Sequence, residues 1–420
     1  MKAPRTGDNT NYPQRRFRLA YVVSHPIQYQ AGLLRLIAAQ PDIDLLVIFC
    51  SDFSVRGYKD EGFGAEVRWD VPLVEGYRSV VLPRVRETSS PSPTRPIAHG
   101  FLRHLSRGLD GKPFDAVWVH GYASINSLHA MLAAKALGVP VLLRAESWLQ
   151  DRSRSQRKLL LKKASFALLK WLVAAVLPIG RRNRMYWEHY FGEQFPSYTM
   201  PYAIDNAYFQ QRSAAAADSR TALQERLGIE PGEPVILFAS KLQERKHCDH
   251  LLEAYLELRA HGQSGTPYLL IVGDGEMRPA LERRARESDC DRIVFAGFQN
   301  QSDLPRLFDL STVFVLPSRH EAWGLITNEA MACGLPVIVT EDAGCAADLV
   351  QNGENGFVYP VGDLSALRAA LEATLQPGSA ARMGQRSREI IAGWSYAQDV
   401  DGLRQALRSV TGGTRAEKDL

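Results

Sequence analysis

Short apolar segments alternate with amphipathic ones along almost the whole chain, and this alternation is what most limits the folds open to it. The apolar segments are rich in β-branched residues, and the stretches between them space their apolar residues as a helix does. This pattern predicts parallel βαβ units, because parallel strands need a crossover between them. The strands are expected at 17–23, 43–49, 116–119, 139–143, 174–177, 235–239, 268–272, 293–296, 313–316, 337–340 and 356–359.

Both halves of the chain show this pattern, so we expect an α/β fold with two Rossmann-like, doubly wound parallel-sheet domains that face a cleft. The boundary is expected within 201–219, where the Ser213–Ala217 segment is simple in composition. A last helix is expected at about 396–410, with a frayed tail after it. The expected division is therefore 1–205, 206–392 and 393–420.

Charge and cysteine content exclude several classes of protein. The 50 lysines and arginines against 46 acidic residues leave a net charge of +4, too small to indicate a nucleic-acid partner. The five cysteines form no C-x-x-C pair and are expected to be reduced thiols, so neither a disulfide framework nor a zinc site is predicted. The amino terminus lacks a signal-peptide pattern, and no apolar run reaches the ~18 residues of a membrane helix. A cytoplasmic protein is expected.

The strongest candidate site is the segment from His320 to Glu329, directly after the strand expected at 313–316. Gly334 and Pro336 are helix-stop signals, so a short helix is expected at about 323–333. The first turn of a helix has unpaired N–H groups and a positive partial charge, which together favour anion binding.

Two carboxylates, Glu321 and Glu329, belong to this segment. Glu321 precedes the expected helix, and Glu329 lies inside it eight positions later. At a helical rise of ~1.5 Å per residue, they are at most ~12 Å apart. Side chains so placed could bracket a diphosphate and accept hydrogen bonds from hydroxyl groups on either side. The alternative is a helix-capping carboxylate and a solvated helix residue.

Two further candidates lie at strand ends of the same half. Lys241 and Lys246 follow the strand expected at 235–239, and two ammonium groups on one loop could neutralise a pyrophosphate leaving group. The turn Gly273–Asp274–Gly275 follows the strand expected at 268–272, and its glycines would let the backbone approach a ligand. A solvated loop and a plain turn are the respective alternatives.

In this order and on these turns, the three elements resemble the motifs of the retaining nucleotide-sugar glycosyltransferases of family 4, which have the two-domain GT-B fold. The resemblance is strong over about 235–375, where Glu321 and Glu329 match the family's E-x7-E motif and Lys241 and Lys246 match its basic pair. The turn at Gly273–Gly275 matches the family's glycine-aspartate-glycine turn.

In the first half the resemblance is looser. It rests on His120 at a strand end, where the family keeps a histidine near the transferred sugar, and on the sequence GRRNRMYWEHYFG. Two departures from the family pattern concern the residues that bind the donor phosphates. The family's glycine-rich first loop is here Ser24 to Tyr29, and the first basic residue, usually arginine, is Lys241, which offers a point charge and no planar fork.

The resemblance implies transfer of a glycosyl unit from a nucleoside-diphosphate sugar to an acceptor hydroxyl, with retention of the anomeric configuration. The C-terminal helix is then expected to cross back to the first domain. No metal or other cofactor is expected, because no D-x-D-type element is placed to hold a metal ion. The acceptor would be a glycan, a lipid-linked compound or a small molecule, in the assembly of a surface polysaccharide, a lipopolysaccharide or another glycoconjugate.

The same resemblance assigns expected roles. Glu321 would orient the sugar hydroxyls and Glu329 the ribose. Lys241 and Lys246 would stabilise the departing diphosphate. The donor would also contact the helix start and the glycine turn, and its base would lie near two residues of the next strand end: Gly324, Leu325, Gly273, Asp274, Gly275, Phe298 and Gln299.

The first half would supply the acceptor or sugar side of the site. His120 is the main candidate, with a structural histidine as the alternative. Weaker candidates lie on strand ends and turns at the same edge: His25, Gln28, Tyr29, Arg144 and Glu146. For Arg144, an ion pair without a ligand stays open.

Three alternatives remain at the level of segments and of the whole chain. The basic, leucine-rich segment 152–171 is either a helix that lies on an anionic membrane surface, on the inner face of the membrane, or a core helix with a basic outer face. The aromatic and glycine-rich stretch 58–77 favours a packed hairpin over an acceptor platform. A non-catalytic nucleotide-sugar or glycan-binding protein on the same scaffold is the rival to an enzyme.

Overall fold

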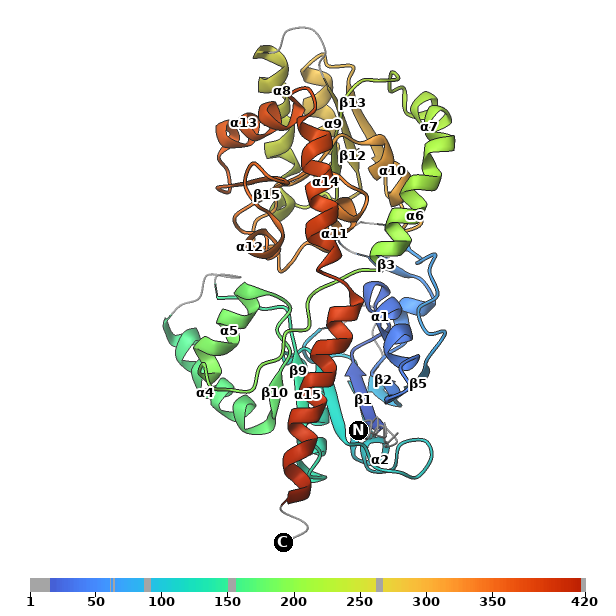
Figure 1. Cartoon of the computed structure of the whole chain (residues 1–420), viewed down its shortest axis with the longest axis vertical. Helices are drawn as coiled ribbons and strands as arrows, with labels where there is room; N and C mark the ends of the chain where they lie inside the picture. The colour runs from blue at the N-terminus through green and yellow to red at the C-terminus, as the bar shows by residue number, and fades with distance from the viewer. Residues whose placement is uncertain are drawn as a thin grey trace, which may run out of the picture.

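The computed structural model describes residues 16–60, 62, 65–86, 92–149, 156–261 and 267–416. Over these residues the chain forms two lobes, one above the other in Figure 1, each built around a parallel sheet. Helices cover both faces of each sheet, so each lobe is a doubly wound α/β layer structure, and the predicted fold class is confirmed.

The first lobe contains a six-stranded parallel sheet within the described residues, in the order β10-β9-β8-β1-β2-β5. Its strands are β1 (Phe17–Val23), β2 (Ile43–Phe49), β5 (Arg78–Val81), β8 (Ala116–His120), β9 (Val141–Arg144) and β10 (Ala175–Val176). Its helices are α1 (Gln28–Ala38), α2 (Phe101–Arg107), α3 (Ile125–Ala136), α4 (Gln156–Leu172) and α5 (Arg181–Phe191). Short strands pair as β3 (Tyr58–Asp60) with β4 (Ala65–Val67), and β6 (Arg84–Arg86) with β7 (Ile97–Ala98).

The second lobe repeats this plan, with the order β13-β12-β11-β14-β15-β16 for the strands that the structure describes. They are β11 (Val235–Ala239), β12 (Tyr268–Val272), β13 (Ile293–Gly297), β14 (Val313–Leu316), β15 (Val337–Thr340) and β16 (Gly356–Tyr359). The helices are α6 (Asn206–Ala216), α7 (Arg220–Leu227), α8 (Cys248–His261), α9 (Arg278–Glu287), α10 (Leu304–Leu310), α11 (Leu325–Ala332), α12 (Ala346–Leu349), α13 (Leu364–Leu375) and α14 (Ser379–Ala392).

Both faces of the first sheet are buried, which explains why its strands are continuously apolar. Along β1, Ala20 and Val22 join one core cluster, whereas Leu19 and Tyr21 join another. Successive side chains of a strand point to opposite faces, so the two clusters lie on opposite sides of the sheet. The sheet therefore has no solvated face along β1.

The strand order reverses at the same place in both sheets. In the first lobe the reversal lies between β1 and β8, and in the second between β11 and β14. Open α/β sheets bind ligands in the crevice beyond the carboxyl ends of the strands at this reversal. The loops after β1, β8, β11 and β14 are therefore the ones placed to form a site.

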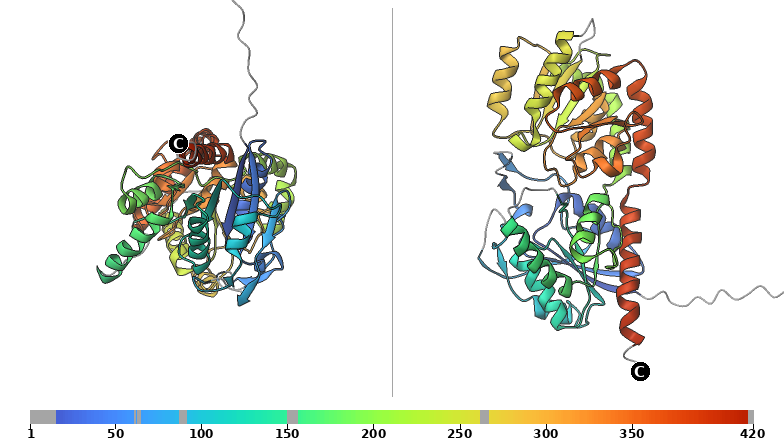
Figure 2. Two further views of the ribbon diagram at one scale, coloured as in Figure 1. Left: turned by 90° about the horizontal axis from the view of Figure 1, so that it is seen from below. Right: turned by 90° about the vertical axis from the view of Figure 1, so that its left-hand side faces the viewer.

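The final helix, α15 (Tyr396–Ala416), leaves the second lobe and packs along the first. Figure 2 shows α14 and α15 following one side of the molecule from one lobe to the other. Val400, Leu403 and Leu407 of α15 are buried in the same core cluster as β1. The expected crossover is confirmed, but the expected frayed tail from 411 is wrong up to 416, because Thr411 is buried and the helix continues.

Two segments contain elements that the sequence pattern did not predict. The stretch 58–77 contains part of a hairpin, and directly after it lies β5, the edge strand of the first sheet, whose side chains are half or fully exposed and so lack a clear apolar pattern. Most of the simple Ser213–Ala217 segment belongs to α6, which packs on α10 and α11. Alanine is the best helix former, so this composition favours a helix.

Among the helices that the structure describes, none is both long and apolar enough to span a bilayer. Of the basic segment 152–171, residues 152–155 lie outside the described residues. The remainder forms α4, on the outside of the first lobe.

Candidate functional site

Backbone pairing fixes the position of Glu321 in the loop that follows β14. The loop after β14 forms a parallel bridge between Glu321 and Ala343, and the Gly344 N–H donates to the Glu321 carbonyl at 3.0 Å. Gly324 has a φ of 92° and is the residue before α11, a conformation that glycine adopts without strain. The loop thus delivers Glu321 and the amino end of α11 to the same place.

Lys246 meets Glu321 directly, and the two come from the loops after β11 and β14. The Lys246 Nζ atom donates a hydrogen bond to Oε2 of Glu321, and Arg245 Nη1 lies 3.6 Å from the same oxygen. Lys246 is buried, which lowers the pKa of its ammonium group, while Glu321 acts in the opposite direction. The structure therefore places a desolvated cation beside a carboxylate at the strand-order reversal.

Glu329 lies in the middle of α11 and is not a solvated helix residue. Its side chain is buried, and its Oε2 atom has no hydrogen-bond partner among the described residues. Burial raises the pKa of Glu329 to about 8. A buried carboxyl oxygen without a partner is costly, so it is a natural acceptor for a donor group supplied by a ligand.

The loops after β11 and β12 are packed against each other. Gly273 has a φ of 133°, and a Cβ atom there would overlap the carbonyl oxygen of Ser240. Asp274 is engaged locally, since its Oδ2 accepts from Arg278 Nη1 at 2.8 Å and its Oδ1 from the Gly275 N–H at 2.8 Å. The glycine turn therefore serves loop packing, and its predicted ligand contact stays a prediction.

First-lobe residues reach the second lobe beside these loops. A Cβ atom on Gly62 would lie 2.7 Å from Cδ of Lys241, so the tip of the β3–β4 hairpin touches that lysine. Gln28 donates to Oε1 of Gln301 at 2.8 Å. Phe298 and Gln299 are half-buried in the same loop as Gln301, at the carboxyl end of β13. The tip of the β3–β4 hairpin thus contacts the second lobe.

His120 and Glu146 form the centre of the first-lobe part of the site. His120 ends β8, and its Nε2 lies 3.6 Å from Oε1 of Glu146. The amide nitrogen of buried Gln30 lies 3.1 Å from Nε2 of His120. The hydroxyls of Tyr29, at 3.3 Å, and of Tyr202 donate to Glu146. Burial raises the pKa of Glu146, but His120 and Tyr202 outweigh it, so the pKa lies below its ordinary value.

His25 also belongs to the first-lobe part of the site. Its Nδ1 lies 2.8 Å from the Ser24 hydroxyl, and its ring packs 4.5 Å from that of Phe53. Burial and nearby His120 lower the pKa of His25 to about 4, so it is neutral at neutral pH.

A pocket of about 330 Å³ lies between the two lobes and joins the two groups of residues. His120, Gly121 and Glu146 line it from the first lobe, and His320 and Ala322, on either side of Glu321, line it from the second. Of the predicted site residues, His120 and Glu146 line this pocket, whereas Glu321 lies between two second-lobe residues that line it.

Arg144 is the candidate that the structure removes from this pocket. It is buried and donates from Nη2 to the carbonyls of Met200 (3.0 Å) and Pro201 (2.8 Å) and to Oδ1 of Asp399 (3.1 Å). The ion-pair interpretation is therefore correct for Arg144. The pattern did not show this partner because Asp399 lies on α15, 255 positions away.

The segments that cross between the lobes are tied to α11. Trp323 donates to Asn328 at 2.9 Å, and Asn328 in turn donates to the carbonyl of Tyr202 at 3.0 Å. Trp394 donates to the same carbonyl at 3.0 Å and stacks on Trp323 with ring centroids 5.5 Å apart. The sequence did not predict these contacts between the crossing segments and α11. Trp323, inside the E-x7-E motif, and Trp394, before the last helix, were signals for them.

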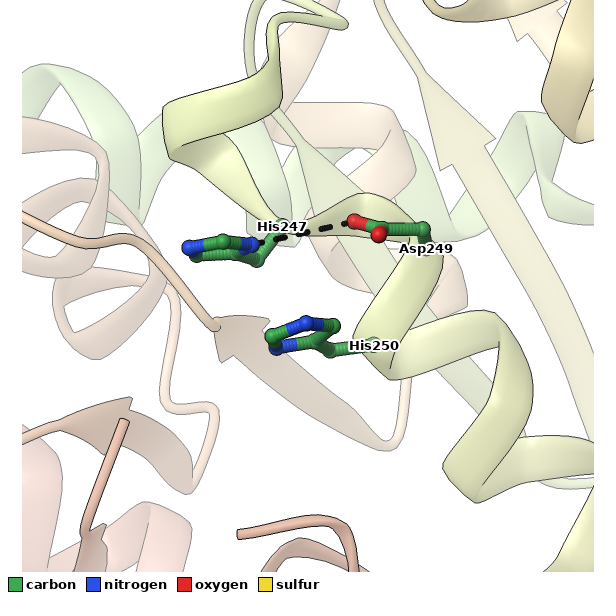
Figure 3. A group of neighbouring side chains, drawn as sticks. All are labelled: His247, Asp249 and His250. Carbon is green, nitrogen blue, oxygen red and sulfur yellow. Dashed lines mark ion pairs between the residues drawn. The ribbon is translucent and has the colours of Figure 1, made fainter. Parts of the chain in front are cut away.

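One group among the described residues has the composition of a metal site. His247, Asp249 and His250 place ligand atoms within 4.8 Å of one another (Figure 3). The two imidazole rings are stacked, however, with centroids 4.2 Å apart and an angle of 12° between planes. Ring-nitrogen lone pairs lie in the ring plane, so in this arrangement they do not converge on one ion. The geometry does not favour a metal centre here.

The family comparison matches the second lobe. Residues 219–390 match the sequence profile of the family described as "Glycosyl transferases group 1". This range contains the Lys241–Lys246 loop and the segment from Glu321 to Glu329.

Curated relatives are glycosyltransferases by name. An alpha-D-kanosaminyltransferase of Streptomyces kanamyceticus is 28% identical over 56% of this chain and 61% of its own length. A D-inositol 3-phosphate glycosyltransferase of Rhodococcus jostii is 30% identical over 46% and 44%. A GDP-mannose-dependent alpha-(1-6)-phosphatidylinositol monomannoside mannosyltransferase of Mycolicibacterium smegmatis is 30% identical over 55% and 63%. The matches thus span 44–63% of these relatives' lengths.

Solved structures match nearly the whole chain. Anabaena HepE in complex with UDP and glucose has a TM-score of 0.69 at 16% identity and covers 94% of this chain and 100% of its own. Sucrose-phosphate synthase from Thermosynechococcus elongatus has a TM-score of 0.66 at 17% identity and covers 95% and 100%. The two lobes and the site between them thus define a GT-B protein. The chain thus has the GT-B fold, and over residues 219–390 it is similar to the glycosyltransferases of family 4.

Proposed function

We propose that the protein is a retaining glycosyltransferase that moves a sugar from a nucleoside-diphosphate sugar to an acceptor hydroxyl. The observation that carries the proposal is the meeting of Lys246 and Glu321 at the amino end of α11, where the strand order reverses. A diphosphate at this point would face a buried ammonium group and the N–H groups of the first turn of α11. The likeness to a protein solved with UDP and UDP-glucose supports a donor of this class.

The remaining groups have roles that follow from their placement. Glu329 offers a carboxyl oxygen that has no partner in the part of the chain that the structure describes, and it is suited to ribose hydroxyl groups. Glu321 lies beside the pocket that His120 and Glu146 also line, so it would orient the hydroxyls of the transferred sugar. His120, with Glu146 and Tyr29, would contact the sugar or the acceptor. Lys241, Gly324, Leu325, Phe298 and Gln299 remain proposed donor contacts.

The proposed reaction needs no side-chain base. The acceptor oxygen forms a bond to the anomeric carbon on the leaving-group face while the bond from that carbon to the diphosphate oxygen breaks. The acceptor proton moves to the departing diphosphate, whose charge Lys246 and the α11 amino end stabilise. Retention follows because attack and departure occur on the same face. We propose that this mechanism is independent of metal ions.

We also propose that the protein is cytoplasmic and acts in the assembly of a surface polysaccharide, a lipopolysaccharide or another glycoconjugate. The candidate for a contact with the inner face of the membrane is α4. The named substrates of relatives include a cyclitol phosphate and a glycolipid, which supports acceptors of these classes. The proposed domain division remains 1–205, 206–392 and 393–420.

The test is a panel of nucleoside-diphosphate sugars. Binding is scored by the rise in unfolding midpoint, and turnover by release of nucleoside diphosphate with candidate acceptors. A donor that binds and turns over, with unchanged rates after chelator treatment, supports the proposal. Loss of turnover on chelation that returns with a divalent ion would overturn the metal-free mechanism. Binding without any turnover across the panel would favour the rival, a non-catalytic sugar-nucleotide binder.

Replacing Glu329 by glutamine is expected to weaken donor binding, because one of the two carboxyl oxygens becomes an NH₂ donor, and to stabilise the free protein. In the folded state its pKa of about 8 lies above the ordinary value of 4.5, so the stability linked to its proton is complete below pH 4.5 and is lost as the pH rises through about 8. The stability advantage of Glu329→Gln should therefore grow at about 1.4 kcal/mol per pH unit across this window. Unfolding midpoints from pH 5 to pH 9 with and without donor measure both effects; a pH-independent difference would contradict the assignment.

A further inference from the structure

A second cavity, the α3–α4 groove, lies on the outside of the first lobe. It has a volume of about 750 Å³ and is lined mainly by apolar side chains of α3 and α4. Those that carry the argument are Ile125, Leu128, Leu161, Leu168 and Leu172. Lys162 is the charged residue among the lining residues. No part of the proposed transfer reaction uses this groove.

The groove leaves large apolar side chains in water. Leu161 is 71% exposed, Leu168 52% and Leu128 36%, although all three line the same cavity. Single exposed leucines are common on protein surfaces, whereas a contiguous apolar patch indicates a binding site. Trp171, 58% exposed at the end of α4, and Leu132, 42% exposed on α3, extend the patch.

The groove adjoins the pocket between the lobes, because the two cavities share part of their walls. Tyr122 and Ala123 line both cavities. They follow closely on His120, which is proposed to contact the sugar or the acceptor. A ligand with its hydroxyl group beside His120 could therefore extend past Tyr122 into the groove without leaving the protein surface.

Firm contacts fix the walls of the groove. The Tyr122 hydroxyl lies 2.8 Å from Oγ of Ser147 and 2.5 Å from the hydroxyl of Tyr186. The ammonium group of Lys162 lies over the rings of Tyr186 and Tyr190, 4.6 and 4.8 Å from their centroids. These contacts join α4 to α5 and to the rim of the cleft, so the groove is preformed.

Because the groove and the pocket between the lobes adjoin at Tyr122 and Ala123, the geometry points to an acceptor that carries a hydrocarbon chain. The chain would lie in the α3–α4 groove and the reacting hydroxyl in the pocket beside His120. This inference rests on the proposed function and names the substrate class of the same site. Charge supports this occupant: Lys135 and Lys163 are exposed on the same two helices, where they suit the anionic head groups among which such an amphiphile resides.

The test uses hexyl, octyl and decyl glucosides below their micelle concentrations, with binding measured by isothermal titration calorimetry. Each methylene that enters the groove should tighten binding by up to ~4-fold, the factor that corresponds to ~0.8 kcal/mol per buried methylene. In the Leu128→Asn/Leu168→Asn variant this dependence on chain length should disappear. A second variant, Ser165→Phe, fills the groove from α4 and should weaken decyl glucoside binding.

The matched control is Leu109→Asn, an exposed leucine in the turn that follows α2, which should keep the dependence on chain length. Unfolding midpoints show that the variants are folded. Affinities that do not change with chain length would overturn the inference, as would a slope that both groove variants retain. Two outcomes would reassign the patch: binding only to anionic vesicles, or a dimer that the double variant dissociates. If affinity depends on chain length but no donor is turned over, the groove would be supported as a chain-binding site while the proposed function would be contradicted.

Discussion

Replacing Lys246 by methionine is expected to lower kcat by ~10²–10³, the loss typical when one preorganised donor to a developing charge is removed. The ammonium group of Lys246 donates to Glu321, in the loop before α11, and is desolvated, so it would interact with a departing diphosphate more strongly than an exposed lysine would. Donor titrations at saturating acceptor separate kcat from KM, and a change in KM alone would contradict a role in the departure step.

The pH dependence adds a second measurement. Because burial lowers the pKa of Lys246, the native enzyme should lose turnover with rising pH below the usual range of a lysine. This decline should be absent in the residual activity of Lys246→Met. The matched control is Arg245→Met, which removes a half-exposed cation 3.6 Å from the same carboxylate. Equal losses in both variants would mean that the effect passes through the position of Glu321.

Replacing Arg144 by methionine is expected to destabilise the protein by about 3–5 kcal/mol, the range for breaking a buried ion pair from one side. The substitution leaves the buried Asp399 carboxylate and the carbonyls of Met200 and Pro201 without their donor. Burial already raises the pKa of Asp399 to about 7 against the pull of Arg144. Denaturant unfolding of the full chain measures the loss.

A double variant tests whether the loss comes from the unpaired charge. Arg144→Met combined with Asp399→Leu should recover much of the stability, because both partners are then apolar. Arg18→Met is a comparison at a less buried pair: Nη2 of Arg18 lies 2.7 Å from Oδ1 of Asp110, whose side chain is 39% exposed, and exposure reduces what such a pair contributes. A loss for Arg144→Met no larger than that for Arg18→Met would contradict the proposed importance of the buried pair.

The sequence predicts the strands of this fold well wherever both faces of the sheet are buried. Strand β15 has its predicted bounds because all its residues are apolar or buried and a glycine and a proline precede it. The edge strand β5 was missed because its side chains are partly exposed, so burial imposes no pattern on it. The helical Ser213–Ala217 segment shows that simple composition by itself does not indicate a linker.

The candidate site also has a part that the sequence predicts and a part that it does not. Its second-lobe part lies in contiguous motifs, so the contact between Lys246 and Glu321 could be anticipated from two strand ends that meet at one edge. Contacts that depend on the packing of distant segments could not. The Gln30 contact to His120 and the Asp399 partner of Arg144 are examples, since nothing in the local pattern indicates either one.

The position of α15 has a consequence for biosynthesis. Val400, Leu403 and Leu407 belong to the core cluster that contains β1, so segments far apart in the sequence are buried together. A chain synthesised without α15 would leave the apolar side of the first lobe that this helix covers exposed to water. Uncovered apolar surface of this kind makes incomplete chains prone to aggregate.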